Sequence, residues 1–228
     1  MYFPWCGLLD QIRLADIFIH YDDVQLSRGF YNRVQVKTEN GTSLLTVPLR
    51  NKKQKQLINA SFISYDENWI EKHRSVLINS YRKLPFFDDA IDLFDYVHSQ
   101  RHVRLHELSR ASIKALADYF QLNKKISYID SVELGIGGSS TRRLVNLTKA
   151  VDGGTYLTGH GALKYLDHNL FERNGIEVRY MDYSLAEYAQ IHGTFTPYVT
   201  ALDAVAHLGA NARHILTSKS KYWREIVG

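Results

Sequence analysis

Residues 125–159 read "KISYIDSVELGIGGSSTRRLVNLTKAVDGGTYLTG". The segments "KISYIDS" and "TYLTG" are rich in β-formers, "GIGGSS" is a glycine loop, and "TRRLVNLTKAV" has the apolar spacing of a helix. The order strand, glycine loop, helix, strand is typical of parallel α/β proteins, whose ligands gather at the carboxyl ends of the strands. The stretch therefore predicts an α/β fold with a parallel or mixed sheet of Rossmann-like or nucleotidyltransferase-like character.

The amino-terminal part of the chain adds a β-hairpin to this architecture. A helix over residues 8–15 precedes a strand over residues 16–24. Residues 30–38 and 42–49 are strand-like and flank "ENG", where Asn40-Gly41 tolerates positive φ, so this segment predicts a hairpin. Residues 58–64 are a further short strand candidate.

The central part of the chain is helical. From residue 66 the apolar period changes from two to about 3.6. Asp66 is a plausible cap for the first helix, and Pro85 suits the first turn of the second. These segments predict a helical layer at about residues 66–122, inserted in a single α/β domain over residues 1–228.

Composition excludes several classes of protein. The 228 residues are 45% hydrophobic and 23% charged, and no apolar run approaches the roughly 20 residues that span a bilayer. We expect a cytoplasmic protein. The net charge is +4, and the clearest basic cluster, residues 50–56, lacks interleaved aromatics, so we expect no nucleic-acid partner. That cluster is either a solvated loop or an attractor for an anionic substrate or a membrane surface.

The histidines and the cysteine give no metal site. The residues His98, His102 and His106 are spaced by four, which predicts one stripe of a helix. No carboxylate completes a familiar metal signature, so we expect a partly solvated helix face and no metal. The single Cys6 excludes an intrachain disulfide; it is either a buried small residue or a nucleophile ahead of a helix.

The glycine loop at residues 135–140 is the best candidate for binding an oxyanion. Its glycines let the backbone approach a ligand closely, and the following helix turns its amide groups toward the loop. The alternative is a flexible loop with a good helix cap and solvated arginines. The hydroxyls and fixed charges that would hold a phosphate come from Ser139, Ser140, Thr141, Arg142 and Arg143.

Two further segments contain side chains that could transfer a proton. The second strand of the opening stretch delivers His160 to its carboxyl end between Gly159 and Gly161, where the imidazole could exchange a proton near neutral pH. The alternative is a loop histidine bonded to backbone. Lys164 follows one turn later and could face a ligand. In "YDDVQ", Asp22 and Asp23 end the first strand, where one could act as a base, hold an amino group or carry a magnesium ion through water. Paired acids are also common turn formers.

Several phrases together resemble a known family. "YFPWCG", "ADIFIHYDDVQ", "NRV", "LLTVPL", "TRRL", "YLTGHGALKYL" and "FTPYVTALDAVAHLG" are similar in order and spacing to the WbqC-like family of bacterial O-antigen and surface-polysaccharide loci. The resemblance covers nearly the whole chain. It implies transfer of glycine, or a similar amino acid, to an amino sugar, in the biosynthesis of lipopolysaccharide. Family members begin with a short apolar strand ending in Gln-Pro, so the resemblance implies a strand before Tyr2 that this sequence does not contain.

The resemblance also suggests substrate-binding residues near the start of the chain. With a strand before it, the opening would form a strand, a tight loop and a helix, as in a mononucleotide-binding half. Tyr2 and Trp5 would then offer flat faces to a sugar or base, and Gly7 would let the loop close against a phosphate. The matching phrases add Gln25, Asn32 and Arg33 as substrate-binding candidates.

A second resemblance, limited to motifs, is to nucleotidylyltransferases and pantothenate synthetase. "GGSSTRRL" is similar to their Ser-Ser-Thr-x-x-Arg phosphate loop, whereas Pro-Trp-x-Gly replaces their His-x-Gly-His. The missing histidine pair counts against nucleotidyl transfer itself. We therefore expect the three pieces, the aromatic opening and the two glycine-bearing turns, to form one pocket for a nucleotide-linked amino sugar.

The reaction, partners and cofactors follow as hypotheses. An amine of a nucleotide-linked amino sugar would attack an activated amino acid, with His160 or Asp22 removing the proton. ATP and Mg enter only if the protein activates the amino acid itself. The alternatives are an acetyl- or formyltransferase on the same acceptor, for which no cofactor signature is visible, and a noncatalytic sugar-nucleotide-binding protein. Aromatics such as Tyr31 and Trp223 are either routine core or the contact of a homodimer.

Overall fold

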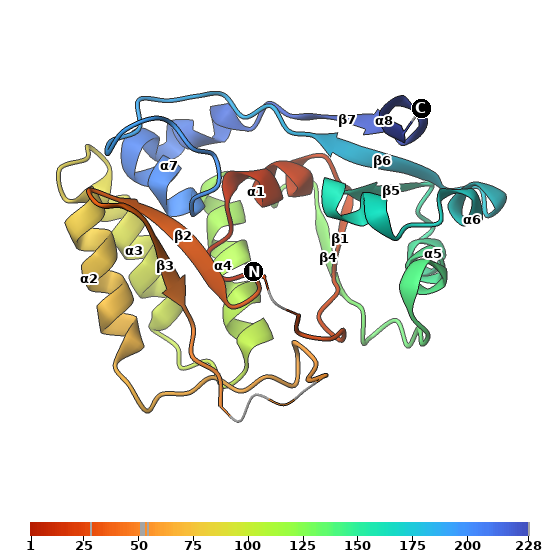
Figure 1. Cartoon of the computed structure of the whole chain (residues 1–228), viewed down its shortest axis with the longest axis horizontal. Coiled ribbons are helices and arrows are strands. Elements are labelled where there is room, and N and C mark those ends of the chain that lie inside the picture. Colours follow the sequence, from red (N-terminus) through yellow and green to blue (C-terminus); the bar gives the residue numbers. More distant parts are fainter. Residues whose placement is uncertain (28, 51–52, 54, 228) are drawn as a thin grey trace. The chain divides into compact units, whose positions relative to one another are not determined.

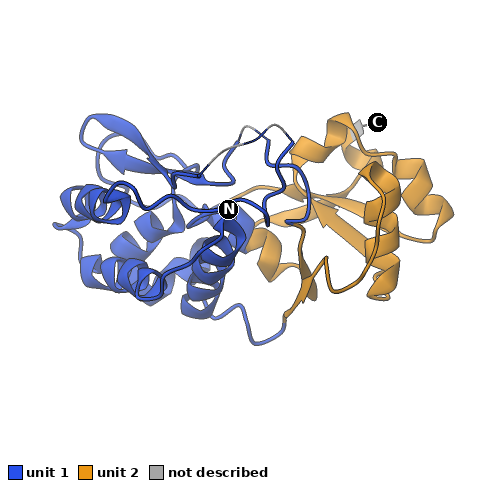
Figure 2. Cartoon of the chain, turned by 90° about the horizontal axis from the view of Figure 1, so that it is seen from below, with its two compact units in different colours: residues 1–9, 22–125, 185–216 blue, residues 10–21, 126–184, 217–228 orange. Residues whose placement is uncertain are grey.

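Two groups of helices and strands make up the chain. The computed structural model describes residues 1–27, 29–50, 53 and 55–227, and its element order is labelled in Figure 1. Residues 51, 52 and 54 of the basic cluster lie outside the described residues. The two groups are coloured in Figure 2: unit 1 holds residues 1–9, 22–125 and 185–216, and unit 2 holds residues 10–21, 126–184 and 217–228. The expected single domain stays a prediction.

The parallel strands lie in unit 2. β1 (Ile17–His20) pairs in parallel with β4 (Ser127–Asp130). β5 (Thr155–Thr158) pairs in parallel with β6 (Glu177–Asp182), which pairs antiparallel with β7 (Lys219–Tyr222). The α/β class and the predicted strand, loop, helix and strand are confirmed. The two strands of the opening stretch, however, belong to separate small sheets.

Helices pack on these strands through apolar stripes. α5 (Ser140–Ala150) buries Leu144, Val145 and Leu147, while Lys149 remains exposed. Leu144 and Val145 meet residues of β6 in one core cluster, which includes Val178 and Tyr180. The burial of these side chains supplies the main stabilising free energy of the unit. The other helical segments of unit 2 are η1 (His160–Lys164), α6 (His168–Arg173) and α8 (Arg224–Val227).

Unit 1 contains the predicted hairpin. β2 (Arg33–Thr38) and β3 (Gly41–Thr46) pair antiparallel, with Thr38 opposite Gly41, so the turn is made of two residues. Gly41 has a φ of 101°, a conformation that favours glycine. The hairpin is therefore confirmed, and of the expected pair Asn40-Gly41 it is Gly41 that takes the positive φ.

The predicted helical layer is also present in unit 1. It consists of α2 (Trp69–Tyr81), α3 (Phe87–His98) and α4 (Leu105–Tyr119). Unit 1 also contains α7 (Ala201–Leu208) and η2 (Gly209–Ile215), and α1 (Cys6–Arg13) begins in unit 1 and ends in unit 2.

Four local predictions were wrong. Pro85 is not in the first turn of α3, because the N-cap of that helix is Phe86 and its first residue is Phe87. The cap of α2 is Asn68 rather than Asp66. The expected strand at residues 58–64 forms only isolated bridges, such as Phe62 with Arg104. The three histidines do not share a helix, because α3 ends at His98 and α4 begins at Leu105, so His102 lies between the two helices.

Candidate functional site

The glycine loop of unit 2 presents an open helix terminus. Ser139 is the N-cap residue of α5, and its side chain makes no capping hydrogen bond. Ser139, Ser140 and Arg142 are exposed. The first amide groups of a helix need partners, and they carry partial positive charge. The hydroxyl predicted to cap the helix does not do so, which keeps these amides available to an anion.

Two of the predicted anion-binding residues instead hold the loop in place. Arg143 is 7% exposed, its Nε donates to Ile136 O at 2.9 Å, and its guanidinium carbon lies 5.0 Å from the ring centre of Tyr21. Thr141 is buried, and its hydroxyl oxygen accepts a hydrogen bond from the Asp167 amide at 3.0 Å. Through these contacts Arg143 and Thr141 hold the glycine loop in place, while Arg142 supplies the exposed positive charge.

The second glycine-bearing turn lies at the carboxyl end of β5. His160 is exposed between Gly159 and Gly161, at the start of η1, and Lys164 is exposed at its end. β5 and β6 are parallel, so the residue that follows β6 lies at the same edge. That residue is Tyr183, whose ring centre is 6.0 Å from that of His160.

Tyr183 was not among the predicted site residues. A Cβ at Gly159 would lie 3.1 Å from the Tyr183 hydroxyl, so the glycine makes room for the phenol. Burial, with a smaller contribution from the charge of Asp10, raises the pKa of Tyr183 to about 12. The phenol is therefore protonated at neutral pH. Its position directly after a strand in "EVRYMDY" was the available sequence signal.

The paired acids lie in unit 1. Asp22 is 8% exposed and accepts two hydrogen bonds from Arg110 of α4, at 2.8 Å from Nε and 3.0 Å from a terminal nitrogen. This bidentate pairing anchors the segment after β1 to α4. Asp23 is partly exposed. The role of either acid as a base stays a prediction.

The aromatic opening is divided between core and surface. Tyr2 is fully buried, and its hydroxyl lies 3.2 Å from His73 Nδ1 and 3.0 Å from His98 Nε2. Its ring therefore packs inside unit 1 rather than offering a face to solvent. Trp5 is partly exposed. A Cβ at Gly7 would lie 2.3 Å from Trp5 Cη2, so this glycine accommodates the indole ring.

The remaining predicted substrate-binding residues of unit 1 lie in the hairpin or before it in the sequence. Gln25 is exposed and forms an isolated bridge with Leu57. Asn32 donates to Val47 O at 2.8 Å. Arg33, at the start of β2, has a buried Nε with no hydrogen-bond partner among the described residues.

The predicted site residues therefore fall in both units. Unit 2 brings together the residues around each of its two turns, and unit 1 holds the aromatic opening, the paired acids and the hairpin residues. The convergence of all three pieces on one pocket stays a prediction. A cavity of about 470 Å³ lies within unit 2, lined by β1, β5 and α5 residues including Phe18, Thr148 and Tyr156. None of the predicted site residues is among its lining residues.

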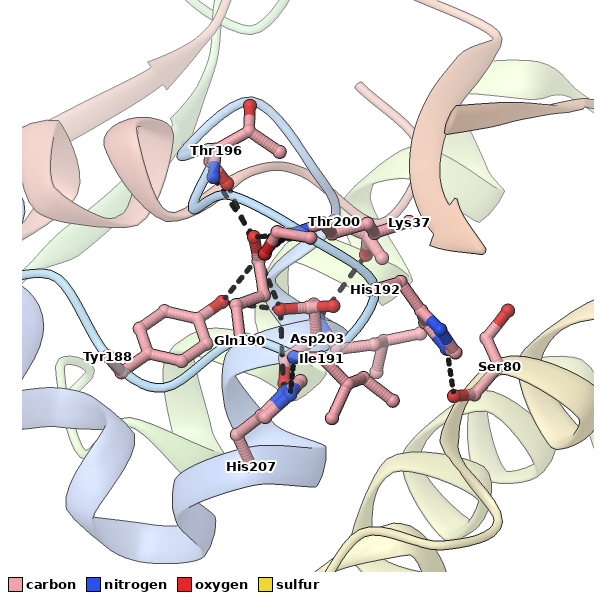
Figure 3. A network of polar contacts seen from close by, with 12 residues as sticks. Lys37, Ser80, Tyr188, Gln190, Ile191, His192, Thr196, Thr200, Asp203 and His207 are labelled. Atoms are coloured by element: carbon pink, nitrogen blue, oxygen red, sulfur yellow. Dashed lines mark hydrogen bonds and ion pairs between the residues drawn. The ribbon is translucent and has the colours of Figure 1, made fainter. Parts of the chain in front are cut away.

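A buried polar network in unit 1 escaped the sequence analysis. Figure 3 shows Gln190 next to Asp203, to whose Oδ1 its amide nitrogen donates at 2.7 Å. The Tyr188 hydroxyl donates to the same oxygen at 2.5 Å. Burial and the charge of Asp203 hold the pKa of Tyr188 far above its usual value, so it remains a donor. The Ile191 amide donates to His207 Nε2 at 3.0 Å, so the ring proton sits on Nδ1, which donates to Asp203 O at 2.7 Å.

The described residues contain neither a candidate membrane-spanning helix nor a candidate metal cluster. No helix among them combines the length and the apolar character needed to cross a membrane. Within the same residues, no three histidine, cysteine or carboxylate side chains are grouped so as to hold a metal ion.

The sequence comparisons with known proteins include all of the site residues described above. The sequence matches the model of the WbqC-like protein family over residues 1–215, which include the aromatic opening, both glycine-bearing turns and the polar network. It is also similar to the uncharacterized protein Rv1507c of Mycobacterium tuberculosis (strain ATCC 25618 / H37Rv), with 31% identity over 215 residues, 92% of this chain and 92% of that protein. No solved structure matches the chain. The chain therefore belongs to the WbqC-like protein family.

Proposed function

We propose that this protein is a transferase that acylates the amine of a nucleotide-linked amino sugar with glycine or a related amino acid, during the synthesis of O-antigen or another surface polysaccharide. The observation that carries the proposal is the exposed amino terminus of α5, whose cap hydroxyl is unused by the helix and whose first turn carries Arg142. Such a terminus suits the phosphates of a nucleotide. Family membership supports the polysaccharide context.

The reaction needs an activated acyl group, because a bare carboxylate is a poor electrophile. The sugar amine forms a new C–N bond to the carbonyl carbon, and the bond from that carbon to its leaving group breaks. The leaving group is AMP if ATP activates the amino acid in this protein, or a thiol if a thioester is supplied. The proton lost by the amine passes to His160, whose ring centre lies 6.0 Å from that of Tyr183.

The direct test is to incubate the protein with UDP-glucosamine or a dTDP-linked 4-amino sugar, glycine, ATP and Mg²⁺, with mass spectrometry for the amide and a pyrophosphate assay. Amide with pyrophosphate supports activation in situ. Amide that forms only from a glycyl thioester supports a supplied donor. If neither mixture yields amide, the proposal is wrong.

A histidine variant tests the assigned base. His160→Gln should lower the rate of amide formation about 100-fold with little change in KM, because a positioned general base contributes roughly 10²–10⁴-fold. His214→Gln, at an exposed histidine of unit 1, is the matched control and should leave the rate unchanged. Equal rates for His160→Gln and the unchanged protein would remove His160 from the mechanism.

A further inference from the structure

Tyr198 carries an exposed aromatic ring that the sequence analysis gave no role. The side chain is 64% exposed, although tyrosine rings are usually half-buried or more. Its ring centre lies 5.7 Å from that of Trp5, with 35° between the ring planes, which is an ordinary aromatic contact. Both residues belong to unit 1, so the two rings form one aromatic surface there.

Backbone pairing fixes the two halves of this surface to each other. Trp5 and Thr200 form an antiparallel bridge, and the Ala201 amide donates to Pro4 O at 2.8 Å. The Thr200 amide donates to Gln35 O of β2 at 2.8 Å. The backbone of the segment after Tyr198 is thus hydrogen-bonded both to the aromatic opening and to the hairpin.

The segment before Tyr198 has no regular secondary structure but is held by a buried lysine. Lys37 of β2 is 4% exposed, and its ammonium donates to Gly193 O at 3.0 Å, Thr194 O at 2.6 Å and Gln190 Oε1 at 2.9 Å. These three bonds use all the donors of the ammonium. Among the described residues Lys37 has no carboxylate within ion-pair distance, so the loop carbonyls and the amide take the place of a counter-ion.

Gln190 connects this lysine to the rest of the network. Figure 3 shows it in contact with both Lys37 and Asp203, and its two amide atoms also contact the Thr196 backbone, at 3.0 Å from N and 3.3 Å from O. The loop backbone in between is unusual, because His192 has a φ of 65°. A residue in this conformation persists only where its surroundings hold it. A loop fixed in this way is typical of a binding surface that is organised before its ligand arrives.

We propose that Trp5 and Tyr198 form a stacking platform for the ring of an amino sugar, and that Lys37 is a positioning residue that holds the Tyr198 loop in place. This inference rests on the proposed function for the chemical class of the ligand, and every residue of the platform belongs to unit 1. Sugar rings present apolar C–H faces to aromatic side chains, and the partly exposed Trp5 and exposed Tyr198 supply such a surface.

Binding measurements test the platform without relying on turnover. Isothermal titration of the whole chain with UDP-glucosamine should give a Kd about five- to tenfold weaker for Tyr198→Ala than for the unchanged protein. UDP alone should bind both proteins equally, because it lacks the sugar. Tyr96→Ala is the matched control, since Tyr96 is 71% exposed on α3 of the same unit and should have no effect.

The positioning role of Lys37 is tested by a double-mutant cycle. Lys37→Met should weaken UDP-glucosamine binding about as much as Tyr198→Ala, and it should add less than about twofold in the Tyr198→Ala background, because the two residues act through one ring. Lys83→Met, at an exposed lysine of unit 1, should change nothing. If Lys37→Met does not fold, Gln190→Met serves in the same cycle.

Each alternative result would contradict a specific part of the proposal. Unchanged UDP-glucosamine binding in Tyr198→Ala removes the platform and leaves the proposed function intact. Equal weakening of UDP would mean that a base, not a sugar, stacks there. Additive effects of the two variants would end the positioning role of Lys37. If the unchanged protein binds neither UDP-glucosamine nor a dTDP-linked 4-amino sugar, both this ligand and the acceptor of the proposed function are wrong.

Discussion

At the scale of single residues, Gly7 decides where the Trp5 ring can lie. A Cβ at position 7 would be 2.3 Å from Cη2 and 2.5 Å from two further indole carbons, so an alanine must displace the ring. Alanine is intrinsically favoured over glycine in a helix by about 1 kcal/mol. Steric overlap in a packed site typically costs about 1–3 kcal/mol, so the clash should win. Gly7→Ala is expected to lower the free energy of unfolding, measured by urea denaturation.

A matched control separates this effect from the loss of a glycine as such. Gly154→Ala adds a methyl group where no atom lies within 4 Å and φ is not positive, so its stability should change little. Tryptophan fluorescence should also shift in Gly7→Ala as the indole leaves its place. Equal stability of the two variants would mean that the ring adjusts without cost.

At the scale of elements, Arg143 links the glycine loop to α5. Replacing it with lysine keeps the charge but loses the planar group that bonds Ile136 O and covers Tyr21. We expect Arg143→Lys to speed hydrogen exchange at residues 135–139 and to cost roughly 1–2 kcal/mol of stability. Arg142→Ala removes an exposed charge from the preceding position and should leave exchange unchanged. The hypothesis fails if both variants exchange alike.

The elements also show what the sequence could predict. Local chemistry identified the hairpin, because Asn40-Gly41 marks the turn, and it identified α5 by its apolar spacing. Sequence reasoning failed where the residues that contact each other are far apart in the sequence. Lys37 lies in a β-rich run and reads as a surface lysine, yet its acceptors Gly193 and Thr194 are more than 150 positions away. The same holds for Tyr2, whose partners His73 and His98 lie on two different helices.

At the scale of the whole molecule, buried histidines couple stability to pH. Burial lowers the pKa of His73 to about 4 and that of His98 to about 3, with a further contribution to His98 from the neighbouring histidines. Burial also lowers the pKa of His106 and His168. In the unfolded chain a histidine titrates near pH 6.5. Between these values the unfolded chain binds more protons than the folded one, so acid favours unfolding.

The stabilising contribution of these histidines should therefore be complete above about pH 6.5 and should fall as the pH drops toward 4 and 3. For His73 and His98 together the loss is on the order of several kcal/mol, because one pKa unit corresponds to about 1.4 kcal/mol. Urea denaturation at pH 7.5, 6 and 5 should show a decreasing free energy of unfolding. The double variant His73→Gln/His98→Gln keeps polar groups near the Tyr2 hydroxyl but cannot titrate, so its stability at pH 7.5 should be lower and its pH dependence shallower. A slope unchanged by the double variant would place the acid sensitivity in other groups, because the two histidines are the most strongly shifted of the four.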